Sequence, residues 1–200
     1  MKKIRIGVLV SGSGYNLQAI IDATKKEILN FAEVVIVISN KKEVLALKRA
    51  EKENIPALFL DPKSYTSRIA YYEKVIHEFK NKKVDLVCLA GFLLKLEPNI
   101  IQHYKHKILN IHPALLPKLG GKGMYGHFVH EAVLKAGEKE SGCSVHLVDD
   151  EFDHGTISLQ RKVPVMPNDT PADLAERILK EEHVLFPQAI AQFIQKNFKI

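Results

Sequence analysis

Apolar and polar residues follow two alternating patterns along this chain. Short, mostly apolar runs rich in aliphatic residues, such as residues 4–10 and 84–90, are typical of strands buried on both faces of a parallel sheet. Between such runs, apolar residues recur at helical spacing. We therefore predict strands at residues 4–10, 33–39, 57–60 and 84–90, and helices at residues 15–26, 43–54 and 66–80. On the last of these helices, the predicted apolar side consists of Ile69, Tyr72, Val75, Ile76 and Phe79. This alternation predicts a doubly wound α/β fold with a mostly parallel sheet flanked by helices.

The pattern changes after about residue 140. Residues 144–148 and 156–165 are two extended segments that can pair with each other, which predicts an antiparallel extension of the sheet. A closing helix is predicted over residues 171–193, with Asp169 and Thr170 near its cap and proline in its first turn. Since the chain has no internal repeats or long linkers, we expect a single domain over residues 1–200.

Composition is that of an ordinary globular protein, with 46% hydrophobic and 26% charged residues. No apolar stretch approaches the length of a membrane span, and the apolar run after Lys3 is too short for a secretory signal. The two cysteines, Cys88 and Cys143, have no metal-like spacing, and we expect both to be free thiols. These features predict a cytoplasmic protein without a membrane partner.

The net charge of +6 raises the question of nucleic-acid binding. The basic residues are dispersed and interleaved with acidic ones, and no aromatic-rich basic stretch occurs, so no nucleic-acid partner is expected. A positive surface also attracts anionic small molecules such as a sugar phosphate or a glutamate-bearing cofactor.

A glycine-containing turn, Ser11 to Asn16, follows the first predicted strand and precedes the first helix. Its glycines let the backbone approach a ligand, and the helix N-terminus offers free N–H groups to a phosphate. Leu17 replaces the third glycine of a dinucleotide-binding fingerprint, and no Gly-Lys-Ser/Thr occurs here, so a monophosphate ester is the better guess. A purely structural strand-to-helix turn remains the alternative.

Three side chains suited to acyl chemistry follow in the second half of the chain. An apolar run at residues 107–109 leads into Asn110 and His112, and Asp153 comes later in an acidic segment. An asparagine donates a hydrogen bond to an oxyanion, a histidine exchanges a proton near neutral pH, and an aspartate orients the imidazole and raises its pKa. No serine or cysteine lies at residues 110–113, so the attacking group would belong to a substrate. A packed or capping histidine is the alternative.

The segment Asn110-Ile111-His112-Pro113-Ala114-Leu115-Leu116-Pro117 resembles the signature of the folate-dependent formyltransferases. The segments 10–20, 89–92 and 142–146 fit the same family in the same order, and the first resembles its members of de novo purine synthesis. The resemblance covers nearly the whole chain and implies a Rossmann-like formyltransferase fold. It implies transfer of a formyl group from 10-formyltetrahydrofolate to the amine of glycinamide ribonucleotide, without a metal. We expect a monomer or weak homodimer.

The resemblance also implies roles for individual residues. The catalytic residues would be Asn110, His112 and Asp153. The ribonucleotide and its phosphate would be bound by Gly12, Ser13, Gly14, Tyr15, Asn16 and Glu182. The folate would be bound by Arg68, Leu93, Leu94, Lys95, Leu96, Asn110, Asp149, Asp150, Glu151, Phe152 and Asp153.

The chain departs from the family pattern at three places. Tyr15 replaces a small residue, Leu179 replaces a polar residue of the last helix, and residues 118–126 carry four glycines where many members have a shorter loop. That segment is expected either to close over the substrate or to be an inert insertion.

The nearest alternatives are a formyltetrahydrofolate hydrolase or another folate-dependent formyltransferase. Hydrolases of this type carry an additional N-terminal regulatory domain, and methionyl-tRNA formyltransferases carry a C-terminal RNA-binding domain, neither of which we expect here. A non-catalytic nucleotide-binding module is a further alternative, and it would not need the Asn110, His112 and Asp153 set.

Overall fold

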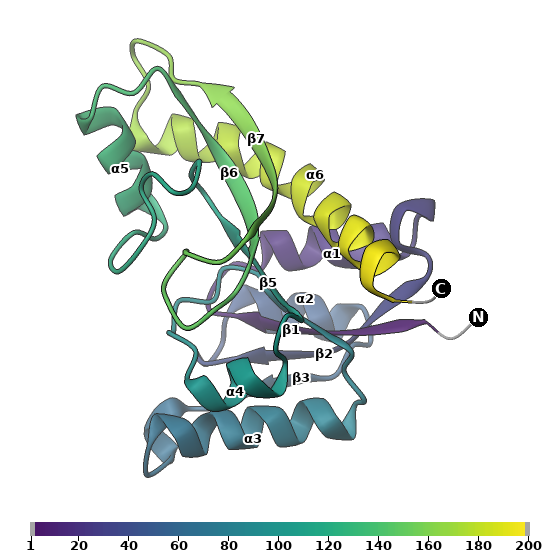
Figure 1. The fold of residues 1–200 in the computed structure, drawn as a ribbon. Coiled ribbons are helices and arrows are strands. Elements are labelled where there is room, and N and C mark those ends of the chain that lie inside the picture. Colours follow the sequence, from purple (N-terminus) through teal and green to yellow (C-terminus); the bar gives the residue numbers. More distant parts are fainter. Residues whose placement is uncertain (1–2, 199–200) are drawn as a thin grey trace.

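The computed structural model describes residues 3–198, and in these residues seven strands form one sheet (Figure 1). The strands lie in the order β3-β2-β1-β4-β5-β6-β7. Strands β1 to β5 are parallel to one another, and β6 runs antiparallel to both of its neighbours, β5 and β7. The strands are β1 (Ile4–Val10), β2 (Ala32–Ser39), β3 (Ala57–Phe59), β4 (Leu86–Leu89), β5 (Ile108–His112), β6 (Glu140–Leu147) and β7 (Ile157–Pro164). The predicted fold class is therefore confirmed, including its antiparallel extension.

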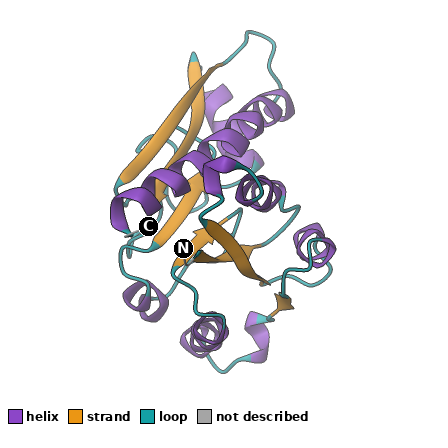
Figure 2. Ribbon diagram, turned by 90° about the vertical axis from the view of Figure 1, so that its right-hand side faces the viewer, coloured by secondary structure: helices purple, strands orange, loops and turns teal. Residues whose placement is uncertain are grey.

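Helices cover both faces of the sheet (Figures 1 and 2). The helices are α1 (Tyr15–Thr24), α2 (Leu45–Lys52), α3 (Arg68–Asn81), α4 (Pro98–His103), α5 (His127–Lys135) and α6 (Pro171–Asn197), with short 3-10 helices η1 (Glu27–Leu29) and η2 (Pro62–Ser64). Apolar residues of α1, α2 and α6 pack in one cluster against the sheet, and those of α3 and α4 form a second cluster with it. None of the helices between residues 3 and 198 is long and apolar enough to cross a membrane.

The closing helix has the predicted start. The Thr170 side chain accepts a hydrogen bond from the Asp173 backbone and the Asp173 side chain accepts one from the Thr170 backbone, forming a capping box, with Pro171 at the first helical position. This helix continues beyond the predicted end, to Asn197.

The prediction that Ile69 belongs to the buried side of α3 was wrong. Ile69 is 51% exposed, and the buried positions are Tyr71, Tyr72, Val75 and Phe79. Ile69 contributes its carbonyl oxygen, which accepts a hydrogen bond from the Asn99 amide of α4 at 3.0 Å, rather than its side chain. Helices α4 and α5 were not predicted because each is short and neither has a long apolar stripe.

Strand β1 pairs with both β2 and β4, so β2 and β3 lie on one side of β1 and the later strands lie on the other. In open α/β sheets this arrangement leaves a crevice at the carboxyl ends of the strands. The loops after β1 and β4 flank that crevice. Ser11 joins them, because its Oγ accepts a hydrogen bond from the Leu93 N–H at 2.9 Å and its own N–H donates to the Gly91 carbonyl at 3.1 Å.

Candidate active site

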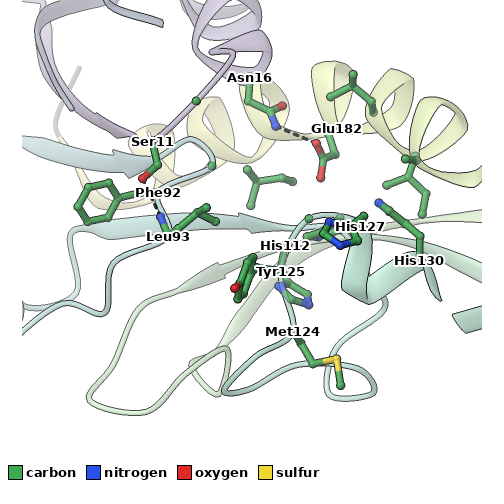
Figure 3. A pocket seen from close by; sticks show the side chains of 18 of the residues that line it. Ser11, Asn16, Phe92, Leu93, His112, Met124, Tyr125, His127, His130 and Glu182 are labelled. Atoms are coloured by element: carbon green, nitrogen blue, oxygen red, sulfur yellow. Dashed lines mark hydrogen bonds between the residues drawn. The ribbon is translucent and has the colours of Figure 1, made fainter. Parts of the chain in front are cut away.

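A cavity of about 1100 Å³ opens at the carboxyl edge of the sheet (Figure 3). Its walls come from the loops that follow β1, β4 and β5, from residues 121–127, and from the N-terminal half of α6. The predicted phosphate turn, residues 12–16, lines this cavity together with Asn110, His112 and Asp153. The fold therefore brings into one cavity two groups of residues that the sequence analysis considered separately.

Asn110, His112 and Asp153 lie next to one another. The two strand residues are two positions apart on β5, so their side chains share one face of the sheet. Asp153 reaches them from the loop between β6 and β7, with its Oδ2 3.5 Å from His112 Nδ1 and its Oδ1 3.4 Å from Asn110 Nδ2. At 3.4 Å the amide-to-carboxylate hydrogen bond is long. The Asn110 N–H group can therefore be redirected to a ligand at little cost.

His146 belongs to the same cluster, and the sequence analysis gave it no role. It is 2% exposed, and its Nε2 lies 3.0 Å from Asn110 Nδ2 and 3.5 Å from Asp153 Oδ1. His146 is directly opposite Asn110 in the antiparallel β5–β6 pair. The missing signal was the pairing of these strands, because the sequence analysis paired the β6 segment only with β7.

Burial and charge act in opposite directions on the His112 imidazole. Burial lowers the pKa of His112 below its ordinary value, although the Asp153 charge and the Leu119 carbonyl, 2.9 Å from Nε2, raise it. Asp153 thus raises the pKa of His112 as expected, but burial outweighs it, and His112 is neutral at pH 7. Burial raises the pKa of Asp153, but the neighbouring His146 and His112 imidazoles and the Gly121 N–H bring the net pKa below its usual range. Asp153 thus remains an anion.

The glycine-rich segment, residues 118–126, forms a wall of this site. The Leu119 carbonyl contacts His112, and the Gly121 N–H donates to Asp153 Oδ2 at 3.1 Å. Gly121 and Gly123 have φ angles of 97° and 91°, a region that favours glycine. A β-carbon at position 120 would lie 3.1 Å from the Asp153 β-carbon and 2.6 Å from Leu116 Cδ2. The glycines thus allow the segment to pack directly on the catalytic candidates.

The turn before α1 has the backbone geometry of an anion site. Gly14 is the N-cap in a left-handed conformation, with no side-chain cap and no acidic residue in the first turn. The first N–H groups of the helix therefore have no intrahelical acceptors. A β-carbon at Gly14 would lie 2.7 Å from the Ala46 α-carbon. Tyr15 points its side chain toward Arg49, whose guanidinium lies 4.9 Å from the ring centroid, and its backbone remains at the turn.

Glu182 closes the same end of the cavity from α6. It is 7% exposed and accepts a hydrogen bond from the Asn16 amide at 2.8 Å (Figure 3). Leu179, which replaces a polar residue of the family pattern, also lines the cavity. Burial raises the pKa of Glu182 to about 7, and the Asn16 hydrogen bond partly opposes this shift. The carboxyl group is therefore poised between its two protonation states near neutral pH.

We expect the Glu182→Gln variant to be more stable than the parent protein at pH 8 and nearly equal to it below pH 4.5. Because the folded-state pKa lies above the ordinary glutamate value of 4.5, the stability due to this group is present below pH 4.5 and is lost as the pH rises through about 7. Glutamine keeps the acceptor for Asn16 without a charge. Thermal melts should show a Tm gain of roughly a few degrees at pH 8. Glu176→Gln, exposed on the same helix, is the control, and an equal gain in both variants would contradict the assignment.

A second, smaller cavity of about 80 Å³ adjoins the first. The predicted folate residues that line it are Leu93, Leu94, Lys95, Leu96, Asn110, Asp149, Glu151, Phe152 and Asp153. Asp150 is exposed and lines neither cavity. Asn110, Phe152 and Asp153 line both cavities, together with Phe92 and Leu93. The two cavities therefore meet at the amide and the carboxylate of the cluster.

Arg68 also lines neither cavity and is held at the start of α3. Its Nε pairs with Glu97 at 2.9 Å, and its guanidinium donates to the Lys95 carbonyl. Arg68 is thus beside the folate-pocket loop, engaged with that loop's own backbone. Residues 3–198 contain no group of three or more histidine, cysteine or acidic side chains placed to hold a metal ion.

The comparisons with known proteins all lead to formyl transferases and purine biosynthetic proteins. The formyl transferase family model matches residues 4–190. The chain is 41% identical over 197 residues to phosphoribosylglycinamide formyltransferase from Escherichia coli, covering 98% of this chain and 90% of that protein. It is 44% identical over 194 residues to a trifunctional purine biosynthetic protein of Drosophila melanogaster, covering 96% of this chain. It spans only 14% of that longer protein. Glycinamide ribonucleotide transformylase 1 from Symbiobacterium toebii superposes with a TM-score of 0.92 at 41% identity, covering 99% of this chain and 91% of that one.

Proposed function

The chain belongs to the formyl transferase family, and from this premise we propose that it transfers the formyl group of 10-formyltetrahydrofolate to the amine of glycinamide ribonucleotide in de novo purine synthesis. The observation that carries the proposal is the meeting of the two cavities at Asn110 and Asp153. A transferase must hold two substrates with their reacting atoms together, and holding them so supplies much of the rate enhancement. We further propose that residues 1–200 act as one catalytic domain in the cytoplasm.

The larger cavity takes the ribonucleotide. Its phosphate binds the N–H groups of the turn Gly12, Ser13, Gly14, Tyr15 and Asn16, where the α1 dipole favours an anion. Glu182, which Asn16 holds in place, faces the sugar that follows the phosphate. The amine then extends toward Asn110 and His112.

The smaller cavity takes the ring system of the folate. Its walls are mainly apolar, from Leu93 to Leu96, with backbone groups of the two loops at their edge. At about 80 Å³ it is narrower than typical ligand pockets, so we expect the half-exposed side chains of Leu93 and Phe152 to move when folate binds. Lys95, whose Nζ lies 5.3 Å from the Phe152 ring centroid, can then meet an anionic part of the cofactor.

The chemistry follows from the cluster at the junction. The ribonucleotide amine attacks the formyl carbon and forms a tetrahedral intermediate with a negatively charged oxygen. Asn110 donates a hydrogen bond to this oxyanion in place of its long contact with Asp153. His112 is neutral before reaction and takes up the proton that the attacking amine releases, which the developing negative charge favours, so it becomes a second donor to the oxyanion.

Proton transfer completes the reaction. Asp153, an anion beside both His112 and His146, orients the imidazole and passes this same proton, through water, from His112 toward N10 of the folate. Collapse of the intermediate breaks the bond between the formyl carbon and N10. The products are the formylated ribonucleotide and tetrahydrofolate.

The test is tetrahydrofolate release from 10-formyltetrahydrofolate with and without glycinamide ribonucleotide. We expect release to depend on the ribonucleotide. Equal release in its absence would indicate a hydrolase with water as the acceptor and would contradict the proposal.

A further inference from the structure

His130 is a buried polar side chain without a partner in the wall of the larger cavity. It lies on α5, just after the glycine-rich segment, and is 5% exposed. Its Nδ1 has no hydrogen-bond partner, although the residue lines the cavity together with His112 and Glu182 (Figure 3). The chemistry described above does not use it.

An unpartnered buried nitrogen is costly to a folded protein. More than nine in ten buried polar groups have a hydrogen-bond partner, and leaving one without a partner destabilises the fold. Within residues 3–198, the protein itself provides no hydrogen-bond partner for His130 Nδ1. A substrate that brings a hydrogen-bonding group into the cavity would provide that partner.

The electrostatic surroundings limit what His130 can do. Burial, together with the nearby His112 and His127 side chains, lowers the pKa of His130 to about 4. The imidazole is therefore neutral at pH 7, with one N–H donor and one acceptor nitrogen. So weak a base is a poor proton acceptor for the amine, and a neutral ring offers little attraction to a phosphate. Uncharged hydroxyl and amide groups match it best.

The position of His130 indicates which part of the substrate it meets. The turn at residues 12–16 and Glu182 lie at the phosphate end of the cavity, and Asn110 and His112 lie at the reacting end. His130 lies near His112, and both line the same cavity as Glu182. The part of a ribonucleotide that spans these two ends carries ribose hydroxyls and an amide.

We propose that His130 hydrogen-bonds the uncharged middle of the ribonucleotide, its ribose and amide, and so determines specificity for the acceptor and positions its amine. This inference rests on the proposed function. His130 is thus a positioning residue whose cost in the free protein is offset when the ribonucleotide binds.

The test uses His130→Phe, which keeps a ring of similar shape and removes both nitrogens. Isothermal titration calorimetry should show roughly tenfold weaker binding of glycinamide ribonucleotide, as expected for one lost buried hydrogen bond. The Kd for 10-formyltetrahydrofolate and the Ki of inorganic phosphate as a competitor should stay unchanged. The Tm of the ligand-free variant should be equal or higher, because the unpartnered nitrogen is gone. His130→Gln, which keeps a donor and an acceptor, should recover part of the affinity.

Tyr71→Phe is the matched control. Tyr71 is fully buried in the other core cluster, its hydroxyl also has no partner, and it lines neither cavity. Its replacement should not change ribonucleotide binding. Unchanged ribonucleotide affinity in His130→Phe, or an equal loss of phosphate affinity, would overturn the inference. Failure of the parent protein to bind the ribonucleotide at all would instead contradict the proposed function.

Discussion

Replacing Asn110 with alanine is expected to lower kcat by about a hundredfold or more, the usual loss when an oxyanion donor is removed. Asn110 is the amide at the junction of the two cavities, and its Nδ2 faces His146 at 3.0 Å and Asp153 at 3.4 Å. The intermediate would then lose its fixed donor. Since this interaction forms only with the oxyanion, the KM for the ribonucleotide should change much less than kcat.

Steady-state kinetics of the purified variant, with its Tm recorded alongside, test this expectation. The substitution also removes the partner of His146 Nε2, so the thermal melt is needed to separate a fold defect from a chemical one. Asn81→Ala, at the exposed end of α3, is the control. A folded Asn110→Ala protein with unchanged kcat would exclude Asn110 as the oxyanion donor.

Asp153→Asn is expected to lower kcat to a similar extent, because the variant loses the anion that orients His112 and passes the proton. The substitution nearly preserves shape, and the asparagine oxygen can still accept the Gly121 N–H. The Asp153 charge raises the pKa of His112 against the effect of burial. Its removal should therefore move the His112 ionisation, followed by NMR titration, to lower pH.

Asp150→Asn is a control from the same loop, since Asp150 is exposed and lines neither cavity. It should leave both kcat and the His112 titration unchanged. If Asp153→Asn keeps the parent kcat and leaves that titration where it was, Asp153 does not act through His112 and the proposed proton path is wrong.

The sequence predicted the parts of the fold that depend on local pattern. The run at residues 4–10 predicts a strand because it is short, rich in valine and isoleucine, and mostly apolar, as expected for a strand covered on both faces of a sheet. The start of α6 was predictable because Thr170 is a residue that caps helices and Pro171 favours the first helical position, both of which are local signals. Ile69 shows the limit of this reasoning. Its side chain is exposed and its carbonyl oxygen contacts α4, which helical spacing alone does not reveal.

The residue pattern alone predicted the site only where its residues are close in sequence, and Asp153 and Glu182 were assigned to it through the family resemblance. Asn110 and His112 alternate on one strand, so their common face follows from the geometry of a strand. His146 joins them only through the β5–β6 register, which is a long-range pairing. The contacts of Leu119 and Gly121 with His112 and Asp153 depend on glycine conformations that sequence does not specify. The same is true of His130, whose lack of a partner is a property of the packed structure.

The central claim, formyl transfer to the ribonucleotide amine, is tested most directly by following the labelled carbon. The protein is incubated with 10-formyltetrahydrofolate carrying a ¹³C formyl group and with glycinamide ribonucleotide, and the products are identified by mass spectrometry. We predict that the label appears in the formylated ribonucleotide in equal amount to the tetrahydrofolate released. Recovery of the label as free formate, with the ribonucleotide unchanged, would contradict the account.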